Sequence, residues 1–435
     1  MLLRRPRRAR SDDDRQWQPK PTRRPGSPRS EAHTSNKSER SDAKVPPAHA
    51  EHRYGATMRH RPPSRLASPS SLAIAFAGLL ALPWLAAGCS AAPGPRVAEE
   101  AVRVAGLDPV ALREMGLAPR WIAPVRSLRP DGITQAGVFG DAVALVEGPD
   151  NLVTALNWAD GRQRWKKSVG LASEDLFAPA FRDGTLLVNS ASRLFEFDAA
   201  NGDLTGVDAL DRPVSAGGVV YEPYLVFGGI NGRLFAHNLD TGRTGWEYQM
   251  SGNIAAPPVL AGDTVFVADV VGTYGLFDAR EGGLIWRNHT FGPVTASPVV
   301  HRNNVLVPSE DRTLYALERS TGNDAWLYRA TQPLREAPLS VGRDVYLPVP
   351  GGGLIGLDPD GQPRWEIPLD AVPVLAGERG IYATLPDGLV LLDPEDGGVV
   401  SATRTGPIRR AATGPDGSLL LVFADGRVVR LDPTN

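Results

Sequence analysis

The sequence predicts an all-β protein, an eight-bladed β-propeller of four-stranded blades that an N-terminal strand closes, over residues 118–435. Three observations support this prediction. A motif recurs about every 40 residues, each repeat contains four short apolar segments, and the two ends of the repeat region complete each other. With 46 Gly and 39 Pro among its 435 residues, the chain also carries the turn residues that many hairpins require.

The recurring motif is a glycine followed four residues later by a tryptophan. Five copies are intact and two are degenerate: Gly161/Trp165, Gly242/Trp246, Gly282/Trp286, Gly322/Trp326 and Gly361/Trp365, then Gly202/Gly206 and Gly397/Ser401. An Asp, Asn or Glu stands shortly before each glycine. A regular period of this length is typical of repeat folds.

Each repeat contains four candidate strands. In one copy they cover residues 296–300, 304–307, 313–317 and 325–328, separated by Gly, Asp, Asn and Pro. Short alternating or apolar runs bounded by such residues are typical of strands. Four strands in about 40 residues correspond to one propeller blade.

The ends of the repeat region predict how the ring closes. Residues 425–432 match the third strand of a blade, and the fourth strand, which would carry the tryptophan, is missing there. An unassigned strand with a tryptophan lies upstream, at residues 118–123. Supplying it to the last blade leaves no open sheet edge and gives eight blades.

The recurrent residues have a structural interpretation. The Asp or Asn side chain accepts backbone N–H groups in a turn, the glycine adopts a positive φ there, and the tryptophan packs on the next blade. The tryptophans in question are Trp121, Trp165, Trp246, Trp286, Trp326 and Trp365. The alternative is a ring of tryptophans that lines a ligand groove, but recurrence in most blades favours packing.

Charge is distributed unevenly along the chain. Residues 1–57 carry 14 Lys and Arg against 7 Asp and Glu, and their composition predicts a disordered basic extension. Residues 89–435 carry 30 bases and 42 acids, a net charge of −12. This acidic main body argues against nucleic acid as a partner and against adhesion to anionic lipid through protein charge.

Residues 58–88 have the composition of a signal peptide. Three arginines precede a 16-residue apolar run, Leu72 to Ala87, and small residues then lead to Cys89. The run is short for a membrane-spanning helix. Because such signals normally begin a chain, we expect Met58 to be the initiator and residues 1–57 not to be translated.

Cys89 is the single cysteine, so neither an intrachain disulfide nor a cysteine-based metal site is expected. The segment Ala86-Ala87-Gly88-Cys89 resembles the lipobox of bacterial lipoproteins, with Ala86 where leucine is usual. The resemblance implies cleavage before Cys89, lipidation of Cys89 and a membrane anchor. In such lipoproteins the residue after the cysteine directs sorting, and Ser90, where Asp is absent, implies the outer membrane, with the protein facing the periplasm. The alternative is a buried structural cysteine.

Residues 89–117 are expected to form a tether between the anchor and the propeller. Residues 97–105 and 108–115 are candidate short helices within it. Asp108 is the expected cap of the second helix, with Pro109 at its first position.

The Asp-x-x-x-Gly-x-x-x-Trp unit, as in residues 278–286, resembles the PQQ-type propeller repeat. Together with the lipobox and eight blades, it resembles the BamB family of outer-membrane barrel-assembly lipoproteins. The resemblance implies a non-catalytic scaffold that binds the barrel-forming subunit. Quinoprotein dehydrogenases share the repeat, but their pocket-building insertions are absent here, so pyrroloquinoline quinone, calcium and metal sites are not expected. A ligand-binding surface propeller is a further alternative.

A partner surface is expected where the connections between outer and inner strands meet, around the central channel. The charged residues assigned to these connections are Glu174, Asp175, Arg335, Glu336, Arg409 and Arg410. They predict an electrostatically patterned docking rim. The alternative is a set of ordinary solvated loop residues.

Overall fold

A computed structural model describes residues 99–104, 106–125, 132–148, 150–169 and 174–434. The chain divides into two compact units, Met1–Ala86 and Ala87–Asn435, and every described residue belongs to the second. The predicted basic extension, the signal peptide and Cys89 lie outside the described residues.

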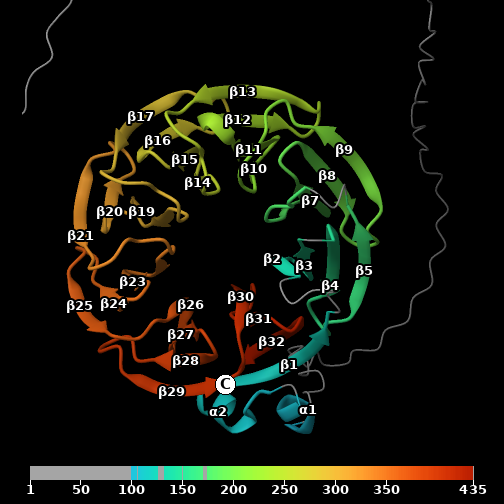
Figure 1. The fold of residues 1–435 in the computed structure, drawn as a ribbon, viewed down its shortest axis with the longest axis vertical. Helices are drawn as coiled ribbons and strands as arrows, with labels where there is room; N and C mark the ends of the chain where they lie inside the picture. The colour runs from blue at the N-terminus through green and yellow to red at the C-terminus, as the bar shows by residue number, and fades with distance from the viewer. Residues whose placement is uncertain (1–98, 105, 126–131, 149, 170–173, 435) are drawn as a thin grey trace, which may run out of the picture. The chain divides into compact units, whose positions relative to one another are not determined.

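The described residues form a ring of eight four-stranded antiparallel sheets, which confirms the predicted all-β, eight-bladed propeller (Figure 1). Blade 1 comprises β2 (Ile133–Phe139), β3 (Ala142–Glu147), β4 (Leu152–Asn157) and β5 (Gln163–Ser168), and blade 2 comprises β6 (Ala180–Arg182), β7 (Thr185–Asn189), β8 (Arg193–Asp198) and β9 (Leu204–Ala209). Blade 3 comprises β10 (Val219–Tyr221), β11 (Tyr224–Gly228), β12 (Arg233–Asn238) and β13 (Arg243–Gln249), and blade 4 comprises β14 (Val259–Ala261), β15 (Thr264–Ala268), β16 (Thr273–Asp278) and β17 (Leu284–His289). A 3₁₀ turn, Ile230–Gly232, connects β11 to β12.

Blades 5 to 8 continue in the same order. Blade 5 comprises β18 (Val299–His301), β19 (Asn304–Pro308), β20 (Thr313–Glu318) and β21 (Asp324–Arg329), and blade 6 comprises β22 (Leu339–Val341), β23 (Asp344–Val349), β24 (Gly353–Leu357) and β25 (Pro363–Ile367). Blade 7 comprises β26 (Val372–Gly377), β27 (Gly380–Leu385), β28 (Gly388–Leu392) and β29 (Val399–Arg404), and blade 8 comprises β30 (Ile408–Thr413), β31 (Leu419–Phe423) and β32 (Arg427–Pro433) with β1 (Leu117–Pro124). In the copy that illustrated the repeat, the second to fourth strands match the predicted segments within one residue at each end.

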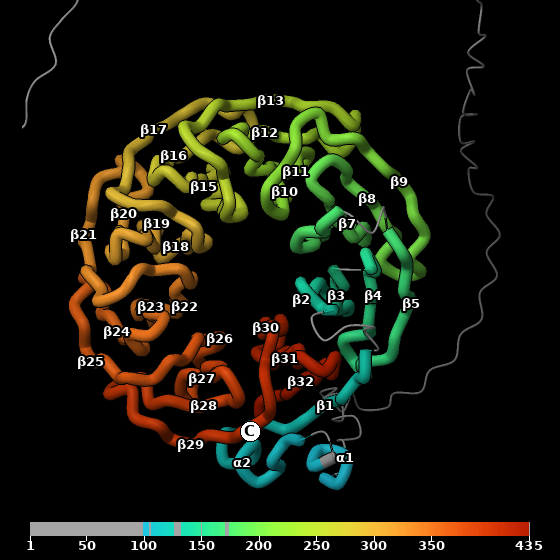
Figure 2. The backbone as a smooth tube through the Cα atoms, in the orientation of Figure 1, coloured from blue at the N-terminus to red at the C-terminus, as the bar shows by residue number. Residues whose placement is uncertain are grey.

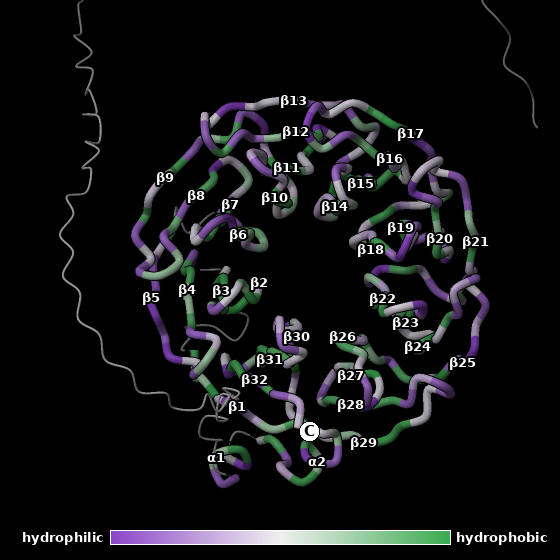
Figure 3. Tube along the Cα trace, turned by 180° about the vertical axis from the view of Figure 1, so that it is seen from behind, coloured by the Kyte–Doolittle hydropathy of each residue, from purple (hydrophilic) through white to green (hydrophobic). Residues whose placement is uncertain are grey.

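The two middle strands of each blade carry most of the core. All residues of β3, β24, β28 and β31 are buried, because each blade packs between two others and both of its faces are covered. The outermost strands alternate between exposed residues and residues that are partly or fully buried, as in β13. Figure 3 shows the hydrophilic residues gathering on outer strands such as β5 and β25.

The ring closes as the sequence predicts. β1 pairs antiparallel with β32, and Trp121 lies opposite Arg430 in that ladder. The blade that ends the chain thereby gains its fourth strand, and the C-terminal end of the chain lies beside β1 and β29 (Figure 2). Closure removes the unpaired edge that an open sheet would leave.

Two short helices precede β1: α1 (Glu99–Val104) and α2 (Pro109–Glu114). Asp108 caps α2 as expected, since its carboxylate accepts the N–H of Val110 at 2.9 Å, and Pro109 begins the helix. The segment differs from a free tether because α2 packs against β1 and β29. Side chains of this segment join the core shared by blades 7 and 8: Val102, Leu107, Leu112, Met115 and Leu117.

Neither helix within the described part of the chain has the length and apolar character that crossing a membrane requires.

Candidate functional site

The recurrent tryptophans lock six of the eight blades to the next one. In blade 4, the indole of Trp286 lies over Gly322 of blade 5, where an added Cβ would lie 2.5 Å from Cδ2 of the indole. The indole N–H of Trp286 donates to the carbonyl of Arg319 at 2.9 Å. Gly322 has a φ of +75°, which glycine adopts without strain. The packing of an indole on a glycine of the next blade recurs around the ring, for Trp121 on Gly161, Trp165 on Gly202, Trp246 on Gly282, Trp326 on Gly361 and Trp365 on Gly397.

In five of the seven repeats, the acidic or amide residue of the motif holds the turn by accepting backbone N–H groups. Asp278 accepts the N–H groups of Arg280 and Glu281 at 2.9 and 2.7 Å. Asn238 and Asp198 make the corresponding pairs of bonds in their own turns. The regular spacing of the motif therefore builds a turn that presents glycine to the neighbouring indole, and these tryptophans are occupied by packing.

The connections that enter the inner strands converge on a central cavity of about 470 Å³. Its wall includes residues from seven of the eight blades, and most of them are small or uncharged: Gln135, Phe177, Ala178, Ser215, Ala216, Gly217, Ala255, Pro257, Thr295, Ala296, Ser297 and Ala337. Its charged lining residues are Arg335, Glu336 and Arg410. The cavity is therefore charged on the side of blades 6 and 8.

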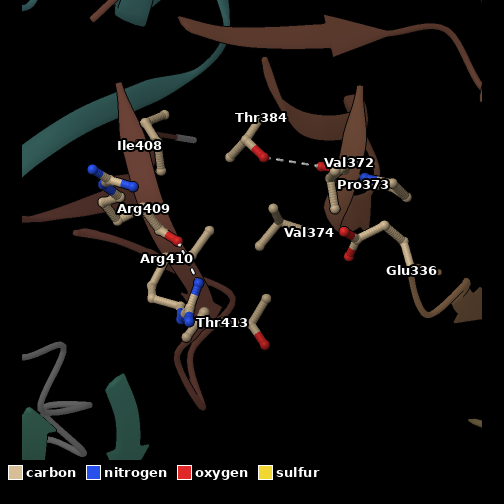
Figure 4. A pocket seen from close by; sticks show the side chains of 11 residues that line it. Glu336, Val372, Pro373, Val374, Thr384, Ile408, Arg409, Arg410 and Thr413 are labelled. Carbon is tan, nitrogen blue, oxygen red and sulfur yellow. Dashed lines mark hydrogen bonds between the residues drawn. The ribbon is translucent and has the colours of Figure 1, made fainter. Parts of the chain in front are cut away.

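A second cavity, of about 610 Å³, adjoins the first at Glu336 and Arg410 (Figure 4). Arg409 and Arg410 project from β30 on one side, and Val372, Val374 and Thr384 come from blade 7. We name Arg335, Glu336, Arg409 and Arg410 the charged rim. The ring thus brings together four of the six charged residues selected from the sequence.

The other two selected residues, Glu174 and Asp175, line neither cavity. Glu174 instead pairs with Arg193, with an Oε1–Nη2 distance of 2.6 Å. The assignment of Arg409 and Arg410 to a connection was wrong, because both lie within β30. The preceding link contains only Thr405, Gly406 and Pro407, so the inner strand begins sooner than in other blades.

Ion pairs and hydrogen bonds position the charged rim. The guanidinium of Arg335 lies 3.0 Å from Glu310 Oε2, and Thr295 donates to Glu310 Oε1 at 2.9 Å. These two partners, Arg335 first, lower the pKa of Glu310. Arg410 donates from Nε to the carbonyl of Thr134 at 2.8 Å, which links blade 8 to blade 1.

An exposed apolar side chain on the same kind of connection was not selected from the sequence. Phe291, between blades 4 and 5, is 86% exposed. Its N–H donates to Asp311 at 3.0 Å, and the adjacent Thr290 hydroxyl donates to the carbonyl of Gly292 at 2.6 Å, so the connection is anchored on both sides. The sequence does indicate that Phe291 is unusual, because the neighbouring repeats carry Ser251 and Thr331 at this position.

Within the described residues, no group of three or more His, Cys, Asp and Glu side chains is arranged to hold a metal ion. Cys89, the predicted lipidation site, lies outside the described residues.

The fold and the repeat define this chain as an eight-bladed propeller built from Asp-x-x-x-Gly-x-x-x-Trp units. A family profile described as "Outer membrane protein assembly factor BamB" matches residues 114–253 and 230–378, more than half of the chain. The chain belongs to this family.

Individual relatives are distant. The BamB proteins of Yersinia pestis and Burkholderia pseudomallei are each 27% identical, over 193 and 165 residues, or 40% and 36% of this chain. The alignments cover 48% and 42% of those proteins, so the chain spans about half the length of the curated relatives it matches. A tetrathionate hydrolase of Acidithiobacillus ferrooxidans is 24% identical over 204 residues, 45% of this chain and 38% of the hydrolase.

Solved structures support the architecture. The crystal structure of BamB from Moraxella catarrhalis matches with a TM-score of 0.59 and 17% identity, covering 72% of this chain and 97% of that one. A computationally designed protein, Ika8, matches with a TM-score of 0.61 at 12% identity, covering 72% and 98%. At these identities the likeness concerns the fold alone.

Proposed function

We propose that this protein is a non-catalytic scaffold in the assembly of outer-membrane β-barrel proteins. In this proposal it is exported, anchored through lipid on Cys89 and held at the periplasmic face of the outer membrane. Membership of the BamB family supports the assembly role. The observation on which the proposal depends is the charged rim, four ionisable side chains gathered on an otherwise uncharged cavity wall.

The rim has the properties of a protein-docking surface. Arg335, Arg409 and Arg410 expose positive charge on a chain whose main body is acidic, and such patterning steers association with a complementary partner. Phe291 adds a rigid, exposed aromatic side chain on a nearby connection of the same kind, and aromatic residues are frequent binding hot spots. We propose that the barrel-forming subunit of the assembly machinery docks here.

Charge reversal with co-purification tests the docking role. The variant R335E/R409E is compared with wild type by capture from detergent-solubilised membranes and quantification of the co-purified barrel-forming subunit. We expect recovery to fall several-fold, because like charges across an interface repel. The matched control is R162E/R280E, which reverses two exposed arginines in turns at the opposite ends of the strands. Equal recovery by R335E/R409E and the control would contradict the docking role.

A catalytic role is the second candidate, and the likeness to a tetrathionate hydrolase is the observation that favours it. We propose instead that the protein carries neither an activity of that kind nor a quinone cofactor. The purified protein should not hydrolyse tetrathionate, and after incubation with pyrroloquinoline quinone and calcium it should not oxidise alcohols. Turnover in either assay that exceeds a heat-denatured control would contradict the scaffold proposal.

A further inference from the structure

The junction between blades 2 and 3 lacks the tryptophan lock. Gly206 occupies the tryptophan position on β9, and a cavity of about 230 Å³ lies between the two blades. Its lining residues are Arg182, Asp183, Thr185, Leu187, Glu196 and Leu239. We name this cavity the blade 2–3 socket.

The socket corresponds in position to an indole in the next junction. Glu196 lies opposite Gly206 in the ladder of β8 and β9, as Ala236 lies opposite Trp246 in the ladder of β12 and β13. The indole N–H of Trp246 donates to the carbonyl of Ala279 at 3.1 Å. Leu239 is the counterpart of Ala279, since each residue directly follows the Asn or Asp of its motif. The socket therefore adjoins the position at which six other blades place a planar ring with an N–H donor. The carboxylate of Asp208 covers Gly242, the glycine on which an indole would lie at this junction.

The residues that face the missing indole are also exchanged for polar ones. His237 stands at the β12 position that Phe197 and Phe277 occupy on β8 and β16. Its Nε2 lies 3.1 Å from Oδ2 of Asp208, and the imidazole is fully buried. Where blade 1 meets blade 2, the same position holds an aromatic pair, Trp165 stacked on Phe197. In this junction, therefore, the tryptophan is absent and polar residues also replace apolar ones in both blades.

Glu196 is the unusual group in the socket. Its side chain is half-buried, and within the described residues its carboxylate makes no hydrogen bond or ion pair. Burial, followed by the nearby charge of Asp208, raises the pKa of Glu196, and the charges of Arg182 and His237 act in the opposite direction. Arg182 lines the same socket, but its guanidinium is 2.9 Å from Glu222 and 2.9 Å from Asp240. A desolvated carboxylate without a partner is costly unless a donor satisfies it.

We propose that the blade 2–3 socket binds a guanidinium group. A guanidinium is planar like an indole, and its N–H donors radiate in that plane. It can pair with the carboxylate of Glu196 and donate to the carbonyl of Leu239. Asp183 lines the socket and Asp208 lies near it, and the positive charge of Arg182, which also lines the socket, is balanced by Glu222 and Asp240. The ligand is either an arginine side chain of a protein partner or a small guanidino compound, and this binding does not depend on the proposed assembly role.

Isothermal titration calorimetry tests the proposal with the mature chain, residues 89–435 after the proposed cleavage, and with N-acetyl-arginine amide as the probe. We expect binding to wild type and at least about tenfold weaker binding to E196Q, which keeps the shape of the side chain and removes its charge. The citrulline analogue, which has the shape of the probe without its charge, should bind wild type at least about tenfold more weakly. Affinity should also fall as the pH is lowered through the raised pKa of Glu196.

Two further variants separate binding from folding. E196A/G206W removes the carboxylate and adds an indole at the tryptophan position of β9, so it should abolish binding, and an unchanged circular dichroism spectrum checks that the variant folds. D203N removes an exposed carboxylate from the turn before β9 and should leave binding unchanged. No binding to wild type at millimolar probe, or equal affinity of wild type and E196Q, would overturn the proposal. An arginine-containing tripeptide that binds more tightly than the single residue would identify a protein partner, and equal affinity would identify a small compound.

Discussion

Single side chains contribute strongly to the packing between neighbouring blades. The indole of Trp286 contacts Gly322 of the next blade and also packs near Phe266 and Tyr274 of its own blade, with ring centroids 5.9 and 6.3 Å away. Its N–H is satisfied by a backbone carbonyl across the junction. One residue thus contributes both apolar burial and a directed bond.

Replacing Trp286 by alanine should lower the free energy of unfolding by about 3–5 kcal/mol, because the change removes buried ring surface and leaves a cavity at the junction. Denaturant titration followed by circular dichroism measures the effect. The control is L284A on the same strand, where the side chain is 40% exposed and the expected loss is below about 1 kcal/mol. Equal stability of the two variants would contradict the locking role of Trp286.

The sequence predicted this residue-scale chemistry where the repeat is regular. The Gly–Trp spacing and the preceding Asp or Asn identify the lock because all three act within one hairpin and its neighbour. Glu196 and Phe291 were not selected as site residues. The importance of Glu196 depends on the absent indole and on Arg182 being paired elsewhere, and neither fact is local in sequence.

At the scale of elements, the segment before β1 contributes to ring closure. Blade 7 carries Ser401 where six other blades carry tryptophan, and this serine is 9% exposed. Because α2 packs against β29, the helix covers the junction that a tryptophan covers elsewhere. The hydroxyl of Tyr382 in blade 7 donates to the carbonyl of Met115 at 2.6 Å, which ties the end of α2 to the ring.

Replacing Leu112 of α2 by alanine should therefore destabilise the whole propeller by about 2–5 kcal/mol, as expected for a fully buried leucine. The melting temperature of the mature chain is the measurement. V110A, on the exposed side of the same helix with Val110 48% exposed, is the control and should change the melting temperature little. If α2 were only a tether, L112A and V110A would melt alike.

The elements themselves were predictable to different degrees. Strand order and the closing strand follow from the repeat, and the cap of α2 follows from Asp108 and Pro109, because these signals are local. The position of Arg409 and Arg410 in β30 was not predicted, since the last blade shortens its entering connection. The packing of α2 on β29 was also not predicted, because no local signal distinguishes a docked short helix from a free one.

At the scale of the whole molecule, the proposed anchor places the ring close to a membrane. The predicted lipidation site is Cys89, and α1 begins ten residues later, at Glu99. A fully extended chain spans about 3.5 Å per residue, so α1 would lie within roughly 35 Å of the lipid. The tether would limit how far the charged rim can reach toward a membrane-embedded partner.

Replacing Cys89 by alanine should prevent acylation, because the proposed lipoprotein carries its acyl chains on this cysteine. Labelled palmitate supplied to the cells should be incorporated into the wild-type protein and not into the variant. The control is S90A, which leaves the cysteine in place and should be labelled. Label on C89A, or its absence from the wild-type protein, would contradict the lipid anchor.

By itself, the sequence determined the blade count, the hairpins, the lock between blades and the closing strand. These features are encoded within single repeats or by the two ends of one periodic pattern, so spacing and turn chemistry suffice to identify them. Only the tertiary structure decided which loop charges meet, since Arg335 and Arg410 adjoin one cavity through ring closure and Glu174 does not. It also decided that a socket lies beside the absent tryptophan of blade 2, with a carboxylate that no described residue pairs, because an empty volume depends on every side chain around it.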